Sequence, residues 1–368
     1  MEPVTISFAE INTEQSNVGA ATLAFAEEVE EKSNGKIKFD YYFSSSLMPG
    51  NEMLTGIGSG VAGAGQLITP YFPQELPVAN ALGSLASLVN DSIPFGVIQG
   101  AAATHEMYQS SDELQQELMS HNIKPLTGIF PYPQYDLLCT KPIDSLAAAQ
   151  GARIRTPGEL QSKEVQALGM VPVPMLAAEA YEALQRGVVD CSVLHPGGYI
   201  DTGLVDVANE YTPVTLSGYN GGVLAINLDI WNKLPLEAQQ IVQDAAIKYW
   251  EQYNLGSIEQ YARFAAEGPS EWGIKFNDSS ELDAEIQDYQ KEAIATLAAE
   301  SDVIDQTFID QYQSLLTKWE GITTELGLNG EARDASSVQE DWSAADDFDR
   351  APVVDRLKTE AFDPYRAK

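Results

Sequence analysis

The chain has 368 residues, 44% of them hydrophobic, and is long enough to fold into two lobes with buried cores. Its 54 Asp and Glu residues outnumber the 21 Lys and Arg residues, which gives a formal net charge of -33. Because a nucleic-acid backbone is bound by clustered positive side chains, we expect no nucleic-acid partner. No apolar run approaches the roughly 18 uncharged residues that a membrane span requires.

The first third of the chain alternates strand and helix patterns. Strands are predicted over residues 4–9, 36–43, 66–69 and 123–129. Helices are predicted from about 17 to 34, over 95–107 and over 111–120. A Pro-rich loop, PYFPQELP, follows the third strand, and loops at strand ends are where an α/β sheet builds a site.

The middle of the chain carries the most regular pattern. Residues 151–196 read as strand, helix, strand, helix and strand, with helices over 159–168 and 177–186. A strand over 137–140 precedes this unit, a helix over 199–208 follows it, and strands over 212–216 and 221–227 return the chain to the first lobe. The alternation predicts an α/β fold with two lobes.

The last third is mostly helical. A helix pattern from about residue 234 to 268 is long enough to run along both lobes, and further helices are predicted over 280–300 and 305–325. Residues 329–368 are acidic and rich in turn residues. The cluster EDWSAADDFD lacks the spacing of a calcium loop, so we interpret it as a solvated face.

A resemblance to a known family rests on GARIRTPGELQSKEVQALGMVPVPMLAAEAYEALQRGVVD at residues 151–190. It resembles the substrate-binding proteins of tripartite ATP-independent periplasmic (TRAP) transporters, the DctP-like family, which share a G-x-K/R-x-R strand and an E-x-Y-x-A-L-Q-x-G-x-V-D segment. VTISFAEINTEQ near the start and INLDIWNKLPLEAQQIVQDAA further on are similar to the same family. The resemblance covers roughly the first 300 residues.

The resemblance implies a two-lobe periplasmic-binding-protein fold with crossover hinge strands and a long connecting helix. We assign lobe 1 to residues 1–132 plus 220–255, lobe 2 to 133–219 plus 256–325, and an acidic C-terminal extension to 326–368. The expected protein is an extracytoplasmic monomer, periplasmic or lipid-anchored, from which a signal segment has been removed. Its expected partners are a small carboxylate ligand and the TRAP membrane subunits.

Arg155 is the main candidate for the ligand site. In similar proteins the second basic residue of G-x-K/R-x-R pairs with the ligand carboxylate, and that position is Arg155, while Arg153 holds the variable one. Two parallel N–H donors of a guanidinium fit two carboxylate oxygens. We expect Arg155 to be solvated in the cleft without ligand and Arg153 to pair with an acidic surface residue.

Departures from the family pattern narrow the ligand. Leu194 and Tyr135 stand where polar contacts are common in the family, and His195 follows a predicted strand where the cleft is expected. The remaining ligand-binding candidates are Gln66, Tyr71, Gly158 and Asn220. A pocket with fewer polar groups and more phenols penalises hydroxyl-rich ligands, so we predict a monocarboxylate with an apolar or aromatic body.

Two alternatives to a transport protein stay open at this point. One is an enzyme on a bilobal scaffold with Cys191 as nucleophile and His195 as base, although no activator flanks the cysteine. The other is an orphan sensor that hands its ligand to a receptor. Cys139 and Cys191 are either two buried thiols or one disulfide, and neither a cofactor nor a metal site is expected.

Overall fold

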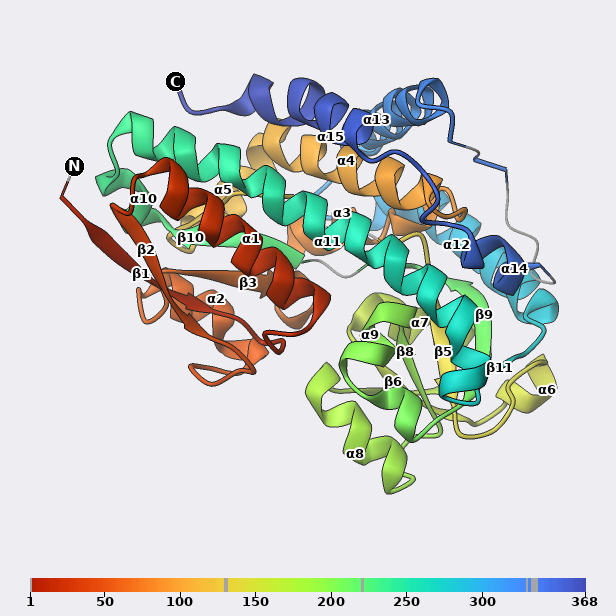
Figure 1. Cartoon of the computed structure of the whole chain (residues 1–368). Helices are drawn as coiled ribbons and strands as arrows, with labels where there is room; N and C mark the ends of the chain where they lie inside the picture. Colours follow the sequence, from red (N-terminus) through yellow and green to blue (C-terminus); the bar gives the residue numbers. More distant parts are fainter. Residues whose placement is uncertain (1, 129–131, 220–221, 329, 332–336) are drawn as a thin grey trace.

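The computed structural model describes residues 2–128, 132–219, 222–328, 330–331 and 337–368. The chain forms two β-sheets, one at the left and one at the lower right of Figure 1, with helices packed around each. The expected two-lobe α/β fold is confirmed.

The first sheet has the strand order β2-β1-β3-β10-β4. β1 is parallel to β2 and to β3, whereas β10 is antiparallel to β3 and to β4. The strands are β1 (Val4–Ala9), β2 (Ile37–Tyr42), β3 (Ala64–Ile68), β4 (Ile123–Pro125) and β10 (Gly222–Asn227). β10 follows β5 to β9 in the sequence, so the strands of the first sheet come from two separate parts of the chain.

The second sheet has the order β11-β9-β5-β8-β6-β7. β6 is parallel to β7 and β8, and β5 is antiparallel to β8 and β9. The strands are β5 (Tyr135–Cys139), β6 (Arg153–Thr156), β7 (Val171–Pro174), β8 (Cys191–Leu194), β9 (Glu210–Leu216) and β11 (Lys275–Phe276). The carboxyl ends of β6 and β8 therefore lie together at one edge of the sheet, where α/β proteins form their sites.

One helix connects the two sheets. α11 (Leu236–Glu271) has 36 residues and is about 54 Å long at 1.5 Å per residue. It passes along both sheets, as the sequence pattern predicts (Figure 1). The other helices are α1 (Asn17–Lys32), α2 (Met53–Gly58), α3 (Pro77–Gly83), α4 (Phe95–Ser110), α5 (Asp112–Ser120), α6 (Leu146–Ala149), α7 (Glu159–Ala167), α8 (Ala180–Gln185), α9 (Pro196–Asp201), α10 (Leu228–Lys233), α12 (Ser280–Glu300), α13 (Gln306–Glu325), α14 (Val338–Ser343) and α15 (Ala351–Leu357).

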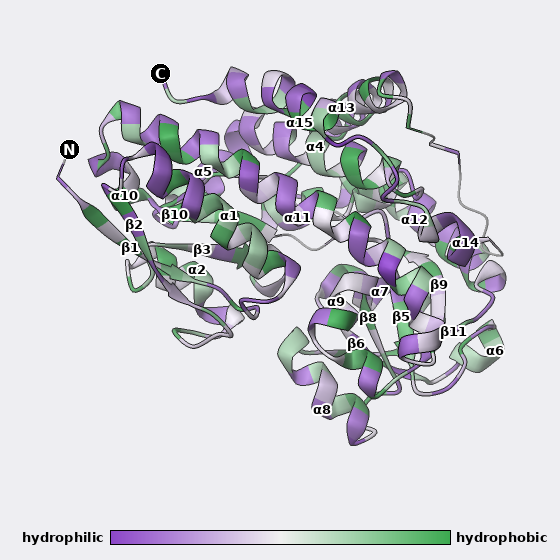
Figure 2. Cartoon of the chain, in the orientation of Figure 1, coloured by the Kyte–Doolittle hydropathy of each residue, from purple (hydrophilic) through white to green (hydrophobic). Residues whose placement is uncertain are grey.

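The core beneath α1 illustrates how the apolar pattern specifies packing. Ser16 caps this helix by accepting a hydrogen bond from the main-chain N–H of Gly19, and Phe25 lies on its buried face. The Phe25 ring packs against Phe8 of β1 and Phe39 of β2, with ring centroids 6.4 and 5.6 Å away. Apolar residues lie along the strands and polar residues along the outer helix faces (Figure 2).

Cys139 and Cys191 form a disulfide bond between β5 and β8. The two residues are direct partners in the antiparallel register of these strands, with their Cα atoms 4.0 Å apart. Of the two alternatives that the sequence left open, two buried thiols or one disulfide, the structure has the disulfide.

The C-terminal segment is more deeply integrated than a turn-rich extension. The acidic side chains of Asp341, Asp346 and Asp347 are exposed, as expected. Trp342 of α14, in contrast, is only 1% exposed and packs edge-on against Tyr261 of α11. The interpretation of the whole cluster as a solvated face is therefore wrong at Trp342, because its indole fills part of the core.

Among the described helices, none is both long enough and apolar enough to cross a membrane.

Candidate functional site

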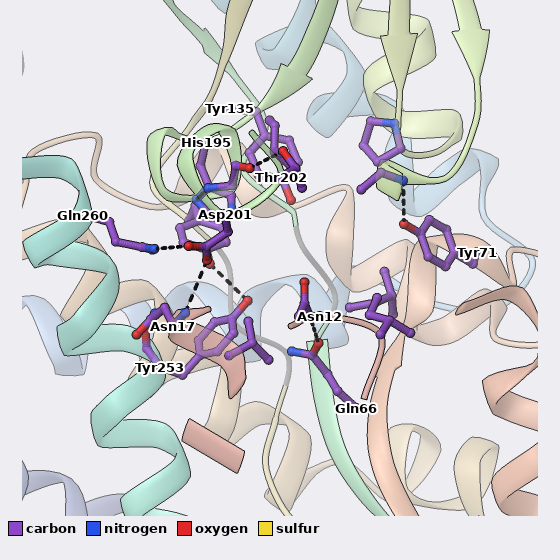
Figure 3. Close-up of a pocket in the computed structure, with 18 of the residues that line it drawn as sticks. Asn12, Asn17, Gln66, Tyr71, Tyr135, His195, Asp201, Thr202, Tyr253 and Gln260 are labelled. Carbon is purple, nitrogen blue, oxygen red and sulfur yellow. Dashed lines mark hydrogen bonds between the residues drawn. The ribbon is translucent and has the colours of Figure 1, made fainter. Parts of the chain in front are cut away.

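A cavity lies between the two sheets and draws its walls from both (Figure 3). The space between its walls, counted together with the open mouth, is about 670 Å³. Its lining residues are Ile11, Asn12, Asn17, Val18, Gln66, Ile68, Tyr71, Tyr132, Tyr135, Arg155, Pro157, Ala177, Leu194, His195, Gly198, Asp201, Thr202, Tyr253 and Gln260. Six of the sequence-predicted residues are thus brought together: Arg155, Tyr135, His195, Leu194, Gln66 and Tyr71.

Arg155 lies on β6 and is only 1% exposed. Its Nε donates to the carbonyl oxygen of Met175, and its Nη1 donates to that of Val193, both at 3.1 Å. Within the described part of the chain it pairs with no carboxylate, and its Nη2 makes no hydrogen bond. The expectation that this side chain is solvated is wrong, because neighbouring strands and loops cover it.

Arg153 lies two residues earlier, at the exposed start of the same strand. Its Nε and Nη2 donate to the two oxygens of Asp190, at 3.2 and 3.3 Å. Burial of Asp190 opposes ionisation, but the hydrogen bonds from Arg153 outweigh it and hold the pKa of Asp190 below its ordinary value. The predicted acidic surface partner of Arg153 is confirmed.

An aromatic wall stands beside Arg155. The His195 ring stacks on Tyr132 with centroids 3.7 Å apart, and Tyr135 lies 6.0 Å away on a nearly parallel plane. Burial lowers the pKa of His195 to about 3. His195 is positioned by the start of α9, where its Nδ1 accepts a hydrogen bond from the N–H of Gly198.

α9 is shorter than the helix predicted over 199–208. It begins at Pro196, which suits the first turn because it lacks an N–H, and it ends at Asp201. Gly203 then adopts φ of 70°, a left-handed conformation that stops the helix before a separate short turn over 204–206. Because α9 begins at Pro196, His195 is the N-cap residue of this helix, and its ring lines the cavity.

The opposite wall carries amide groups. Asn12 Nδ2 donates to Glu10 Oε1 at 2.7 Å and to Gln66 Oε1 at 3.4 Å, so the side chain of Asn12 is fixed between them. Burial raises the pKa of Glu10 to about 7, against the opposing effect of its hydrogen bonds from Asn12 and Thr22. Figure 3 shows Asn12 and Gln66 on one side of the cavity and His195 and Tyr135 on the other.

Two hydrogen bonds join the two lobes at the cavity, and a third, from Gln260, holds Asp201 within its own lobe. Asp201 Oδ2 accepts from the main-chain N–H of Asn17 at 3.3 Å, and its Oδ1 accepts from Gln260 Nε2 at 3.1 Å (Figure 3). Burial raises the pKa of Asp201. At the mouth, the N–H of Ala177 donates to the hydroxyl of Tyr71 at 3.5 Å.

Sequence reasoning missed several of these polar residues. Asn12 lies in the loop that follows β1 and Asn17 is the first residue of α1, so the strand-end rule applied to this stretch could have found them. Asp201 and Gln260 lie on helices with no recognisable motif, and only packing brings them to the cavity.

Two predicted residues remain, Gly158 and Asn220. Gly158 lines an adjoining, more open part of the cleft, which shares Tyr71 and Pro157 with the main cavity. A Cβ at position 158 would lie 3.1 Å from the Cβ of Pro70, so glycine allows this close approach. Asn220 lies outside the described residues.

The cavity is equipped for binding. The sulfur of Cys191 is held in the disulfide and cannot serve as a thiolate nucleophile, which removes the chemistry of the proposed enzyme alternative. In the described ranges of the chain, no three His, Cys, Asp or Glu residues are grouped so that they could hold a metal ion. What the site offers is a buried guanidinium beside aromatic rings and amides.

Comparison with known proteins points to one family. The family model of bacterial extracellular solute-binding proteins, family 7 (DctP), matches residues 8–301. The chain is 28% identical over 251 residues to the C4-dicarboxylate-binding periplasmic protein DctP of Rhodobacter capsulatus, covering 66% of this chain and 71% of that protein. It is 26% identical over 249 residues to a monocarboxylate 2-oxoacid-binding periplasmic protein of Nostoc sp., covering 66% of this chain and 64% of the relative.

Solved structures share the fold. A Bordetella pertussis extracytoplasmic solute receptor binding pyroglutamic acid superposes with a TM-score of 0.70 at 20% identity, covering 84% of this chain and 99% of that one. A marine metagenome TRAP solute-binding protein specific for aromatic acid ligands gives 0.71 at 18% identity, covering 87% and 99%. These families and structures are transporter substrate-binding proteins and not enzymes. The chain therefore belongs to family 7 of the bacterial extracellular solute-binding proteins, the DctP family, and is a TRAP-type solute-binding protein.

Proposed function

We propose that this protein captures a small organic monocarboxylate through a bidentate pair between Arg155 and the ligand carboxylate. The observation that carries the proposal is a guanidinium that is 1% exposed, lines the cavity and has only main-chain carbonyls as partners within the described residues. A buried positive charge that is paired with no carboxylate is unfavourable on its own, and a ligand anion compensates it. The fork geometry matches a carboxylate.

A single carboxylate suits the charges of the cavity. Of the described residues that line it, Arg155 is the only Lys or Arg, while Asp201 adds a carboxyl group. A second carboxylate on the ligand would have to be desolvated without a cationic partner, which is costly. The body of the ligand would contact the rings of Tyr71, Tyr132 and Tyr135, which favour an apolar or aromatic group.

The ligands of similar proteins fit this class in part. The Nostoc relative is named for monocarboxylate 2-oxoacids, and two structural neighbours for pyroglutamic acid and for aromatic acids. The Rhodobacter relative is named for C4-dicarboxylates, so the family alone does not choose between one carboxylate and two. The choice rests on the lining of this cavity.

Delivery to TRAP membrane subunits in an extracytoplasmic compartment completes the proposal. The curated relatives are periplasmic proteins. A disulfide between Cys139 and Cys191 suits an oxidising compartment. For the capture step, we assign residues 1–132 plus 220–255 to one lobe and 133–219 plus 256–325 to the other, in line with the two sheets, although α13 packs on α4 of the first lobe.

A thermal-shift screen tests this function. The panel contains aliphatic and aromatic monocarboxylates, dicarboxylates and sugar acids. A ligand that binds only the folded state adds about 2.7 kcal/mol at a hundred times its Kd, so monocarboxylates should raise Tm the most. If no carboxylate raises Tm, or if dicarboxylates do so more strongly than every monocarboxylate, the proposal is wrong.

A further inference from the structure

The imidazole of His195 has a defined proton position. The main-chain N–H of Gly198 donates to Nδ1 at 3.2 Å. Because a main-chain N–H can only donate, Nδ1 must be unprotonated, and the neutral ring carries its proton on Nε2. His195 therefore has one acceptor nitrogen, which caps α9, and one donor nitrogen.

The donor nitrogen of His195, Nε2, is available to a ligand in the cavity. Within the described residues Nε2 of His195 makes no hydrogen bond, although the residue is only 7% exposed and its ring lines the cavity. Gly198 leaves this nitrogen uncovered, since a Cβ at position 198 would lie 3.1 Å from it. This N–H faces the cavity, and a ligand that filled the cavity without offering it an acceptor would shield it from water unpaired, which is costly.

His195 and Arg155 are fixed relative to one another by β8. The carbonyl oxygen of Val193 accepts from Arg155 Nη1, and His195 follows two residues later. In the register of the sheet, Arg155 is the direct partner of Ser192. The carboxylate-binding fork and the imidazole donor therefore stand at the ends of neighbouring parallel strands.

Building on the carboxylate-binding function proposed above, we propose that His195 Nε2–H donates a hydrogen bond to a neutral oxygen of the ligand. The preferred class is then a monocarboxylate that also carries a keto, hydroxyl or ring carbonyl oxygen. An acid without that oxygen leaves the donor unpaired. A site that hydrogen-bonds a ligand group discriminates against the analogue that lacks it.

The donor keeps its charge state over the ordinary pH range. Burial lowers the pKa of His195 to about 3, so the ring stays neutral between pH 5 and 8. Its stacked neighbours are the phenols of Tyr132 and Tyr135, whose pKa values burial raises. The charged side chains of the same cavity are Arg155 and Asp201. The preference for the oxygen should therefore be the same at pH 5 and pH 8.

Matched acids test the inference by calorimetry. The pairs are pyroglutamate with cyclopentanecarboxylate, 3-hydroxybenzoate with benzoate, and 2-oxobutanoate with butanoate. In at least one pair the unaltered protein should bind the oxygen-bearing acid about tenfold more tightly, the worth of one hydrogen bond in a desolvated site. His195→Asn retains an acceptor for Gly198 but has no donor at the Nε2 position, so it should lose the preference. His195→Gln places an amide N–H near that position and should keep part of it.

Each other outcome has a separate meaning. Binding that depends on Arg155 but shows no preference within any pair overturns the inference and leaves the proposed function standing. A preference that persists in His195→Asn means that another residue binds the ligand's oxygen, which overturns the inference. Binding that strengthens as the pH falls from 8 to 5 and is lost in His195→Asn means that a charged imidazolium binds, against the inference. If none of the six acids binds while another monocarboxylate of the screen does, the inference is overturned and the proposed function stands; if no carboxylate binds in either experiment, both are overturned.

Discussion

At the scale of single residues, two arginines on one short strand have opposite surroundings. Arg153 sits at the exposed start of β6 and has its charge matched by Asp190, whereas Arg155 is covered and bound only to carbonyl oxygens among the described residues. A surface pair of this kind contributes about 0 to 1 kcal/mol. Of the two arginines, Arg155 is therefore the one whose charge is available to pair with a bound anion.

Replacing Arg155 tests that difference. Arg155→Ala should reduce affinity for a bound carboxylate by about 30-fold to several thousand-fold, because loss of a desolvated bidentate partner costs on the order of 2 to 5 kcal/mol. Arg155→Lys should restore only part, since an ammonium lacks the fork. The measurement is calorimetry with one acid from the screen.

Arg153→Ala is the matched control on the same strand. It removes an exposed pair with Asp190 and should leave the affinity nearly unchanged. Similar losses in the Arg153 and Arg155 variants would show that the anchor has been assigned wrongly. Because Arg155 is buried, its alanine variant also leaves two carbonyls unpaired, so thermal unfolding without ligand must be compared first.

At the scale of elements, the disulfide joins β5 and β8 across 52 residues of chain. In the chain-entropy treatment, closing a loop of this length stabilises the folded state by about 4 kcal/mol. Cys139→Ser combined with Cys191→Ser should lower the free energy of unfolding by roughly that amount, measured with urea. In the unaltered protein, denaturation without reductant should expose no thiol to alkylation; two labelled thiols in protein from an oxidising compartment would contradict the bond.

A buried carboxyl group on α7 makes stability depend on pH. Glu164 accepts hydrogen bonds from the N–H of Ser217 after β9 and from Gln290 of α12. Burial nevertheless raises its pKa from 4.5 to about 7. The folded state thus binds this proton more tightly than the unfolded state, so the contribution is full below about pH 4.5 and is lost as the pH rises to about 7.

Urea unfolding at pH 5 and pH 8 measures this effect. The two-unit interval between pH 5 and the folded pKa corresponds to about 2 to 3 kcal/mol of stability lost on going to pH 8. Glu164→Gln should remove about that much of the difference between the two pH values. The remaining pH dependence, from Glu10 and from the general negative charge, stays in both proteins and cancels in the comparison. An unchanged difference in the Gln variant would mean that Glu164 is ionised at pH 5.

The elements that could be predicted from sequence are those with a local cause. Alternating apolar residues specify β1, and the glycine after α7 stops that helix at the predicted place. The strand predicted over 123–129 is regular only over Ile123–Pro125, because Leu126 and Thr127 both donate to the same carbonyl oxygen, that of Leu224, which breaks the ladder; residue 129 lies outside the described residues. Strand register cannot be read from one sequence, so the pairing of Cys139 with Cys191 stayed open.

At the scale of the whole molecule, the site combines segments that only the fold brings together. Arg155 could be proposed because a short motif carries it, whereas Asn17 and Asp201 meet across 184 residues of chain and carry no motif. The burial of Arg155 likewise depends on Met175 and Val193, which neighbouring strands supply. Local patterns therefore identify the anchor but not the polar groups around it.

The C-terminal segment is the least predictable part of the molecule. It lies beyond residue 301, where the family match ends. From residue 326 on, α14 packs on α11 and the last residues return to α11, where Arg366 pairs with Asp244 (Figure 1). Figure 2 colours much of this segment as hydrophilic, which is why composition alone suggested a solvated extension.

Trp342 gives a test of whether this segment belongs to the core. Its ring meets Tyr261 of α11 at 4.9 Å and Tyr211 of β9 at 6.4 Å between centroids. Trp342→Ala should lower the free energy of unfolding by about 3 to 5 kcal/mol, through lost burial and the cavity left behind. Arg366→Ala is the control from the same segment, because its exposed pair with Asp244 contributes only about 0 to 1 kcal/mol. The free energies of unfolding of both variants are measured with urea. If Trp342→Ala is no less stable than Arg366→Ala, the C-terminal segment does not contribute to the core around the second sheet.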